Sequence, residues 1–187
     1  MKLERVLPYV KTLLKNTVSP GDHVIDATAG NGHDSLFLAQ LVGMDGHVYS
    51  FDVQKTVIEA TLLRLGEWRN NTSVIHAGHE TISNQVDSEI SAAVFNLGYL
   101  PGTDHTIITR PDTTIQAIEG CLKLLKVGGL IVLVVYHGHD GGDSERDGLL
   151  DYVRSLPQSY VHVLKYEFIN QQNHPPFVLA IEKMKHL

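Results

Sequence analysis

A short stretch near the start of the chain, VIDATAGNGHD at positions 24–34, places the strongest constraint on the fold. Residues 23–26 have the character of a buried strand, two glycines then predict a turn, and residues 33–41 continue with helical periodicity. Gly30 and Gly32 have no Cβ and can adopt φ > 0, so the backbone there can pass close to a ligand. The free N–H groups of the following helix would point to the same place. The stretch therefore predicts a strand, a turn and a helix around a nucleotide-type pocket.

Two ligands fit such a pocket, a dinucleotide and S-adenosylmethionine (SAM). A dinucleotide site requires G-x-G-x-x-G after an apolar strand, but position 35 is Ser35 and the strand ends in Asp26. A carboxylate suits a cation, and SAM carries an ammonium and a sulfonium but no phosphate. Asp52 follows the next predicted strand and is placed to accept both ribose hydroxyls, although this spacing also permits NAD. The residues favour SAM and leave NAD as the alternative.

Apolar periodicity predicts one α/β domain over residues 1–187, in which residues 1–20 form an N-terminal helix and a turn. Strands are expected at 23–26, 47–51, 72–77, 91–96, 130–135, 160–168 and 177–182, and helices at 3–14, 33–41, 55–68, 107–126 and 144–156. Strands alternate with helices up to residue 156, and two strands then follow with no helix between them. This order predicts a parallel sheet with an antiparallel edge. Such a sheet binds its ligand outside the carboxyl ends of the first, second and fourth strands.

The composition bears on compartment and partners. Cys121 is the only cysteine, no apolar run approaches the ~20 residues of a membrane span, and the N-terminus lacks the apolar core of a signal peptide. We therefore expect a cytoplasmic protein without membrane contact. The net charge of −6 is unusual for a protein that binds nucleic acid, but residues 1–18 hold one acid, Glu4, against the bases Lys2, Arg5, Lys11 and Lys15. This basic helix predicts phosphate contact or, equally, a solvated helix face.

The pattern from Asp26 through Thr28 and Gly30 to Gly32 resembles the D-x-G-x-G-x-G motif of class I SAM-dependent methyltransferases, with Thr28 in place of the first glycine. Three further segments, AGHE at 77–80, FNLGYLPG at 95–102 and NHPP at 173–176, make the chain similar to a small bacterial family. That family is labelled putative rRNA methylases and is associated with tRNA 5-(aminomethyl)-2-thiouridine methyltransferase.

The resemblance implies a Rossmann-like class I methyltransferase fold, with a mostly parallel seven-stranded sheet and an antiparallel C-terminal edge strand. SAM would be the methyl donor, bound by Asp26, Thr28, Gly30, Asn31, Gly32, Asp34, Asp52, Gln54, Gly78, His79 and Asn96. The implied activity is N-methylation of the aminomethyl group of 5-aminomethyl-2-thiouridine at the tRNA wobble position, with the anticodon stem-loop as partner. A homodimer that pairs two basic helices, or recognition confined to the anticodon loop, would help an acidic protein to hold tRNA. Methylation of ribosomal RNA or of a small amine is the alternative within the same class of enzyme.

The loop after the fourth strand is the candidate for handling the target nitrogen. In amino-group methyltransferases this loop commonly reads D/N-P-P-Y/F, and its polar residue and backbone carbonyls accept hydrogen bonds from the amine. Asn96 and Tyr99 occupy the corresponding places here, although both prolines are missing. Asn96 and Tyr99 are therefore the expected catalytic residues of this loop.

A primary amine is largely protonated at neutral pH, so a histidine is expected to take the departing proton. His137 is the catalytic candidate, although the sequence does not rank it above the other histidines of the predicted loops. The expected substrate-binding residues are Tyr99, His105, Tyr136, His139, Asn173 and His174. Of these, Tyr99 and Tyr136 have side chains that can stack on a splayed-out base.

The segment from His137 to Asp143 also permits a metal site. His137 and His139, with Asp140 and Asp143 nearby, are side chains that can bind zinc or iron. Glycines at 138, 141 and 142 instead indicate a substrate loop, so we expect no metal.

Overall fold

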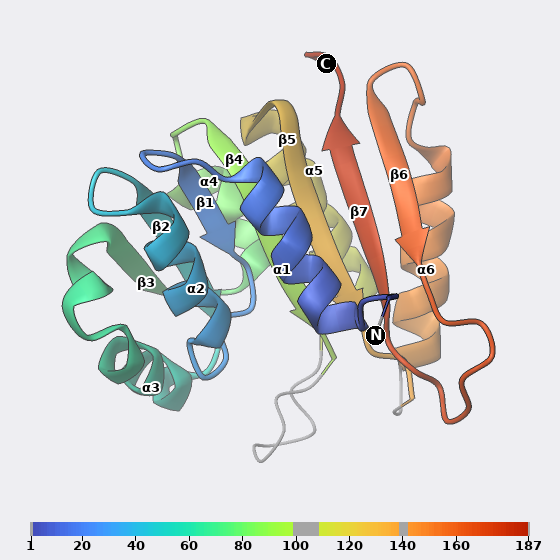
Figure 1. Ribbon diagram of the computed structural model, residues 1–187, viewed down its shortest axis with the longest axis horizontal. Helices are drawn as coiled ribbons and strands as arrows, with labels where there is room; N and C mark the ends of the chain where they lie inside the picture. The colour runs from blue at the N-terminus through green and yellow to red at the C-terminus, as the bar shows by residue number, and fades with distance from the viewer. Residues whose placement is uncertain (1, 99–108, 139–141, 187) are drawn as a thin grey trace.

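The computed structural model describes residues 2–98, 109–138 and 142–186. Its central feature is a seven-stranded sheet with the strand order β3-β2-β1-β4-β5-β7-β6 (Figure 1). The strands are β1 (His23–Asp26), β2 (His47–Asp52), β3 (Thr72–His76), β4 (Ile90–Leu97), β5 (Leu125–Val135), β6 (Val161–Tyr166) and β7 (Phe177–Lys183). The helices are α1 (Val6–Thr17), α2 (His33–Val42), α3 (Lys55–Leu65), α4 (Ile82–Gln85), α5 (Pro111–Leu124) and α6 (Gly142–Ser155), with short 3₁₀ helices η1 (Gly66–Asn71) and η2 (His79–Thr81).

Helices cover both faces of the sheet, and alternate side chains of each inner strand enter opposite cores. On one face, Val24 and Val132 pack with residues of α1 and α2. On the other face, Ile25 and Ile131 pack with residues of α4, α5 and α6. Because both faces are buried, the central strands are apolar along most of their length, as expected for parallel strands. The predicted class I methyltransferase architecture is confirmed.

The position of the antiparallel strand differs from the prediction. The C-terminal strand β7 is antiparallel to both of its neighbours, but it lies between β5 and β6 and does not form the edge. Most of β7 is buried, whereas residues 162–165 of β6 are exposed. Burial on both faces stabilises the apolar strand β7, whereas the more polar β6 can remain exposed at the edge of the sheet.

Two helix ends also differ from the expected bounds. The helix expected to end at residue 68 stops at Leu65, because Gly66 has φ +56° and the chain continues as the 3₁₀ helix η1. The helix expected at 107–126 is α5, which has Pro111 in its first turn and ends at Leu124. The expected end at residue 126 is wrong, since β5 already begins at Leu125.

Within the described residues, no helix is long and apolar enough to cross a bilayer.

Candidate active site

A cavity of about 960 Å³ opens at the carboxyl ends of β1, β2 and β4, where the ligand was expected. Its walls come from the loops that follow the first four strands, from the end of β5 and from one side of α1. The predicted cofactor residues that line this large cavity are Thr28, Gly30, Asn31, Asp34, Asp52, Gln54, Gly78, His79 and Asn96. Asp26 and Gly32 are not part of its lining.

The Asp52 carboxylate is held at the end of β2 by two backbone donors. Its Oδ2 accepts a hydrogen bond from Gly30 N at 3.0 Å, and its Oδ1 accepts one from Gln54 N at 2.9 Å. Each oxygen keeps a further lone pair, because a carboxylate oxygen can accept more than one hydrogen bond. Asp52 thus presents a fixed pair of acceptors to the large cavity, which suits two neighbouring hydroxyl groups.

The glycine turn is shaped by its contact with α3. Gly30 and Gly32 have φ of +51° and +76°, in the left-handed region that favours glycine. A Cβ added at Gly32 would lie 2.9 Å from the Cα of Thr61, and the Thr61 hydroxyl donates to Gly30 O at 3.0 Å. Gly32 therefore permits close packing of α3 against the turn, while Gly30 is the glycine that faces the large cavity.

Asp26 lies behind the turn, which differs from the prediction that it meets a cationic ligand. Its carboxylate is fully buried and accepts hydrogen bonds from Ser35 Oγ at 2.6 Å and Thr28 N at 3.2 Å. Burial, together with the negative charge of Asp34, raises the pKa of Asp26 to about 7 even though the hydrogen bond from Ser35 acts in the opposite direction. The side chain joins the start of α2 to the turn and does not reach the large cavity.

His79 follows β3 and is almost completely buried in the wall of the large cavity. Its Nδ1 lies 3.3 Å from Ala27 O, and since a carbonyl can only accept, Nδ1 carries the proton. Burial lowers the pKa of His79, so the ring is neutral at pH 7 and Nε2 is an acceptor. Such an acceptor can bind an exocyclic amino group, such as the one on the adenine of SAM.

Asp34, Asn96 and Tyr136 form a polar patch in the lining of the large cavity. The Asn96 amide nitrogen donates to Asp34 Oδ2 at 2.6 Å, which leaves the amide oxygen of Asn96 as an acceptor. The backbone N–H of Asn96 donates to Thr28 Oγ1 at 2.7 Å and fixes the end of β4 against the turn. Burial and the charge of Asp34 raise the pKa of Tyr136, so its hydroxyl remains protonated at neutral pH.

Sequence reasoning missed part of the wall. Leu7 and Lys11 of α1 line the large cavity, and so does Arg110, which directly precedes α5. Lys11 belongs to the predicted basic helix, but nothing local indicated that this residue faces the cofactor site. For Arg110 the only sequence signal was the following residue, Pro111, because proline is favoured in the first turn of a helix and so marks a helix start.

His137 does not lie in the large cavity, contrary to the prediction that it serves as the proton acceptor there. It lines a second cavity of about 360 Å³ together with Asn173 and His174. Its Nε2 donates to Pro175 O at 3.1 Å, and its Nδ1 lies 3.5 Å from Arg146 Nη1. Both ring nitrogens are thus engaged in holding the chain together.

Other predicted residues fall outside the described part of the chain, namely Tyr99, His105, His139 and Asp140. Within residues 2–98, 109–138 and 142–186, no three His, Cys, Asp or Glu side chains are grouped as a metal site requires. Asp143, the remaining member of the alternative metal cluster, makes a 2.7 Å ion pair with Arg146.

Comparison with known proteins identifies the family. A family model described as "Putative rRNA methylase" matches residues 48–182. The chain belongs to this family. A crystal structure of a family protein, described as a putative rRNA-methylase from Clostridium thermocellum, superposes with a TM-score of 0.96 at 40% identity, covering 98% of this chain and 100% of that one.

Two further relatives extend this result. A putative methyltransferase from Streptococcus mutans, solved in complex with SAH, has a TM-score of 0.89 at 38% identity and covers 97% of this chain and 99% of its own. The chloroplastic tRNA (mnm(5)s(2)U34)-methyltransferase of Arabidopsis thaliana is 35% identical over 181 residues, which is 90% of this chain. The present chain spans 66% of the length of the Arabidopsis protein. Family and fold together identify SAM as the cofactor, and the Asp52 acceptors, the open backbone at Gly30 and the His79 acceptor fit its ribose, amino-acid and adenine parts.

Proposed function

We propose that the protein is a SAM-dependent tRNA methyltransferase that acts on the amine of 5-aminomethyl-2-thiouridine at the wobble position, giving the methylaminomethyl form. The observation that carries the proposal is the patch of Asp34, Asn96 and Tyr136 in the large cavity, which offers acceptors to an amine. Further support comes from the 35% identity with the Arabidopsis protein, whose name specifies the methylaminomethyl form, mnm(5)s(2)U, at tRNA position 34.

The amine must lose a proton before it can react, because an alkylammonium has no lone pair. The apolar residues Leu7 and Val53, which are exposed in the cavity wall, disfavour the charged form of a bound amine. When bound, SAM supplies the methyl group on a positively charged sulfonium, and that charge also disfavours a neighbouring ammonium. Placement of the amine then matters more than acid–base strength.

In this arrangement Asn96 and Asp34 share the handling of the amine. The Asn96 amide oxygen accepts one N–H and orients the nitrogen lone pair, while Asp34 accepts the departing proton on its carboxylate. The 2.6 Å bond from Asn96 holds Asp34 in place for this step. Asp34 thereby takes the role that sequence reasoning assigned to His137.

Analysis of tRNA nucleosides tests the substrate. We expect a deletion strain to accumulate the aminomethyl form and to lack the methylaminomethyl form by mass spectrometry, and the purified protein with SAM should restore it in isolated tRNA. Unchanged modified uridines would overturn the substrate assignment. Calorimetry with SAM on the same preparation would show separately whether the cofactor site is intact.

A second candidate is methylation of ribosomal RNA, which the description of the family favours. The net charge of −6 favours a third, a small amine, over either RNA. Nucleoside analysis of ribosomal RNA from the same deletion strain separates the first two candidates. The anticodon stem-loop as partner, a homodimer and a cytoplasmic location remain predictions.

A further inference from the structure

The second cavity, here called the hairpin pocket, lies where the loop between β6 and β7 meets the end of β5. Its volume is about 360 Å³, and its lining includes His137, Glu167, Phe168, Gln171, Asn173 and His174. Tyr136 lines the large cavity and the next residue, His137, lines the hairpin pocket. The linings of the two cavities therefore adjoin along the chain at this point, where consecutive Cα atoms are about 3.8 Å apart.

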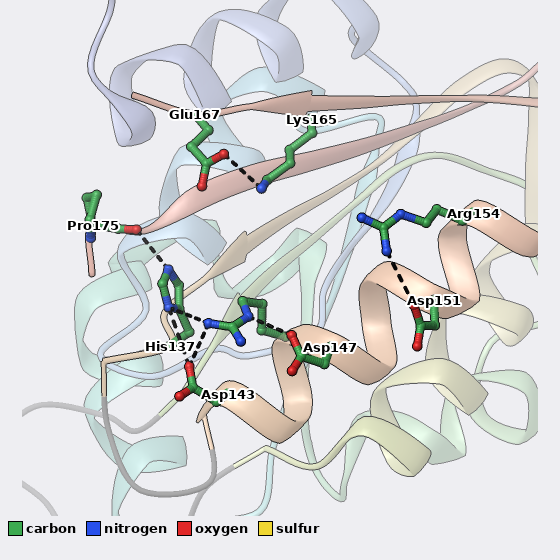
Figure 2. A network of polar contacts seen from close by, with 9 residues as sticks. His137, Asp143, Asp147, Asp151, Arg154, Lys165, Glu167 and Pro175 are labelled. Atoms are coloured by element: carbon green, nitrogen blue, oxygen red, sulfur yellow. Dashed lines mark hydrogen bonds and ion pairs between the residues drawn. The ribbon is translucent and has the colours of Figure 1, made fainter. Parts of the chain in front are cut away.

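One wall of the hairpin pocket is held in place by the polar contacts of His137. Figure 2 shows the His137 ring between Pro175 on one side and Asp143 on the other. Arg146 of α6 lies 3.5 Å from His137 Nδ1 and is itself held by Asp143 at 2.7 Å and Asp147 at 2.8 Å. The ring is only 9% exposed, so this contact ties the loop after β6 to β5 and α6.

The opposite wall holds an unusual backbone. Asn173 and His174 have φ of +64° and +51°, a conformation that residues other than glycine seldom adopt. Gly138 makes room for this segment, because a Cβ at position 138 would lie 3.3 Å from His174 Cβ. The His174 ring packs edge-on against His137 with 5.6 Å between centroids. Strained residues of this kind persist where their surroundings hold them and are concentrated at functional sites.

The side chains of the pocket are suited to an uncharged, planar, polar ligand. Among the residues that the structure describes, the side chains of Gln171, Asn173 and His174 make no hydrogen bonds, although all three line the pocket. Phe168 adds an aromatic ring to the lining. The Glu167 carboxylate, paired with Lys165 at 2.8 Å, disfavours a phosphate. Amides and imidazoles bind the edges of nucleobases, and aromatic rings stack on their faces.

We infer that the hairpin pocket binds the base of an unpaired nucleotide adjacent to the target nucleotide on the same RNA strand. The inference rests on the proposed function, since it requires an RNA substrate in the large cavity. A strand that inserts its target base there passes the end of β5, where the neighbouring nucleotide meets His174 and Gln171. Recognition of one flanking base would give a net-acidic protein affinity that does not depend on phosphate contacts.

The test uses an anticodon stem-loop RNA carrying the target uridine, with an abasic site placed either directly 5′ or directly 3′ of it. The variants are His174→Asn and Gln171→Ala, because Asn tolerates the left-handed backbone and position 171 is not in that conformation. Gln172→Ala is the matched control, from the same exposed loop but outside the lining. We expect each pocket variant to raise KM for the intact RNA about tenfold, the loss typical of one base contact. The kcat, the SAM affinity measured by calorimetry and the melting temperature should stay close to those of the wild type.

The abasic substrates decide between a base contact and a general disturbance of the loop. With the wild type, one of the two abasic RNAs should show the same tenfold rise in KM, and the side on which it occurs identifies the bound nucleotide. With His174→Asn, that same abasic site should add nothing, since one contact cannot be lost twice. Equal sensitivity of wild type and variant to both abasic sites would overturn the inference while leaving RNA methylation intact. Failure of the wild type to methylate any RNA, with SAM still bound, would overturn the proposed function and this inference together.

Discussion

Asp52 connects the glycine turn to the second strand through its bonds to Gly30 and Gln54. We predict that Asp52→Ala weakens SAM binding at least about 100-fold. The reason is that the carboxylate no longer accepts hydrogen bonds from the two ribose hydroxyls. Isothermal titration calorimetry with S-adenosylhomocysteine measures this loss. Asp45→Ala, at an exposed position in a turn, is the control and should bind normally. Unchanged affinity in Asp52→Ala would show that the cofactor lies elsewhere.

Asp26 is a buried carboxyl whose effect on stability depends on pH. The folded protein keeps the proton of Asp26 up to about pH 7, whereas the unfolded chain releases it near 3.8, the ordinary pKa of an aspartate. The folded state therefore binds more protons in this interval, and the free energy of unfolding falls by up to about 1.4 kcal/mol per pH unit as pH rises from about 4 to about 7. Above pH 7 this contribution is constant.

Asp26→Asn should remove that dependence, because an amide does not titrate. We expect the stability of the variant relative to the wild type to increase between pH 4 and pH 7 and to level off above, as measured by urea unfolding at each pH. Comparison with Asp45→Asn corrects for ordinary surface titration, since that side chain is exposed. A difference that is flat across this range would show that Asp26 is ionised in the folded protein.

Asn96 contacts Asp34 and lines the large cavity, so its amide serves the amine more than the cofactor in the proposed mechanism. Asn96→Ala is expected to lower kcat about 100-fold, similar to the loss of one transition-state donor or acceptor, while SAM affinity changes less than about threefold. Steady-state kinetics and calorimetry on one preparation provide both values. Asn70→Ala, at an exposed position of η1, should change neither. A loss of the same size in both quantities would place Asn96 against the cofactor.

At the scale of elements, Lys183 joins the end of β7 to the end of α5. Its side chain is buried, and Nζ donates to Leu122 O at 2.9 Å and to Leu125 O at 2.6 Å. These are carbonyls at a helix C-terminus, which have no partner within the helix. The lysine therefore completes α5 from a strand almost sixty residues further along the chain.

Lys183→Met keeps the length of the side chain but removes both donors. We predict a decrease of about 2 kcal/mol in the free energy of unfolding, the penalty for buried carbonyls left without partners. Chemical denaturation measures it, and the exposed Lys185→Met is the control, expected within about 0.5 kcal/mol of the wild type. An equally small effect at position 183 would mean that water replaces the ammonium.

At the scale of the whole molecule, the net charge of −6 limits how RNA can bind. Lys11 and Arg110 are the lysine and arginine in the described lining of the large cavity. Two phosphate contacts predict that the logarithm of RNA affinity falls with the logarithm of salt concentration with a slope of about −1.4. Fluorescence anisotropy of a labelled stem-loop between low and moderate salt measures this slope.

Charge reversal tests the same prediction with a matched pair on α1. Lys11→Glu should make the slope shallower by about 0.7, whereas Lys15→Glu, on the same helix but outside the cavity lining, should leave it unchanged. A wild-type slope steeper than about −4 would instead require a larger basic surface, such as two α1 helices paired in a homodimer. Sedimentation measurements would then establish the oligomeric state.

Local signals in the sequence determined the parallel sheet, the glycine turn and the acceptor at Asp52. Apolar periodicity identifies strands and helices over a few residues, and glycines mark turns for steric reasons, so neither signal needs distant contacts. Two expected helix ends were wrong. The end expected at residue 68 is set by the positive φ of Gly66, and the end expected at residue 126 is set by the pairing of β5 with β4.

Only the tertiary structure determined which side chains turn away from the ligand and which form the wall of the site. Asp26 turns inward to Ser35, His137 holds the loop at Pro175, and Leu7 and Lys11 of α1 form part of the cavity wall. Burial of β7 on both faces likewise placed it inside the sheet. Each of these features depends on the direction in which a side chain points once distant segments have packed together. Periodicity and spacing describe only neighbours along the chain, so they identified the residues of the site without showing which of them face the ligand.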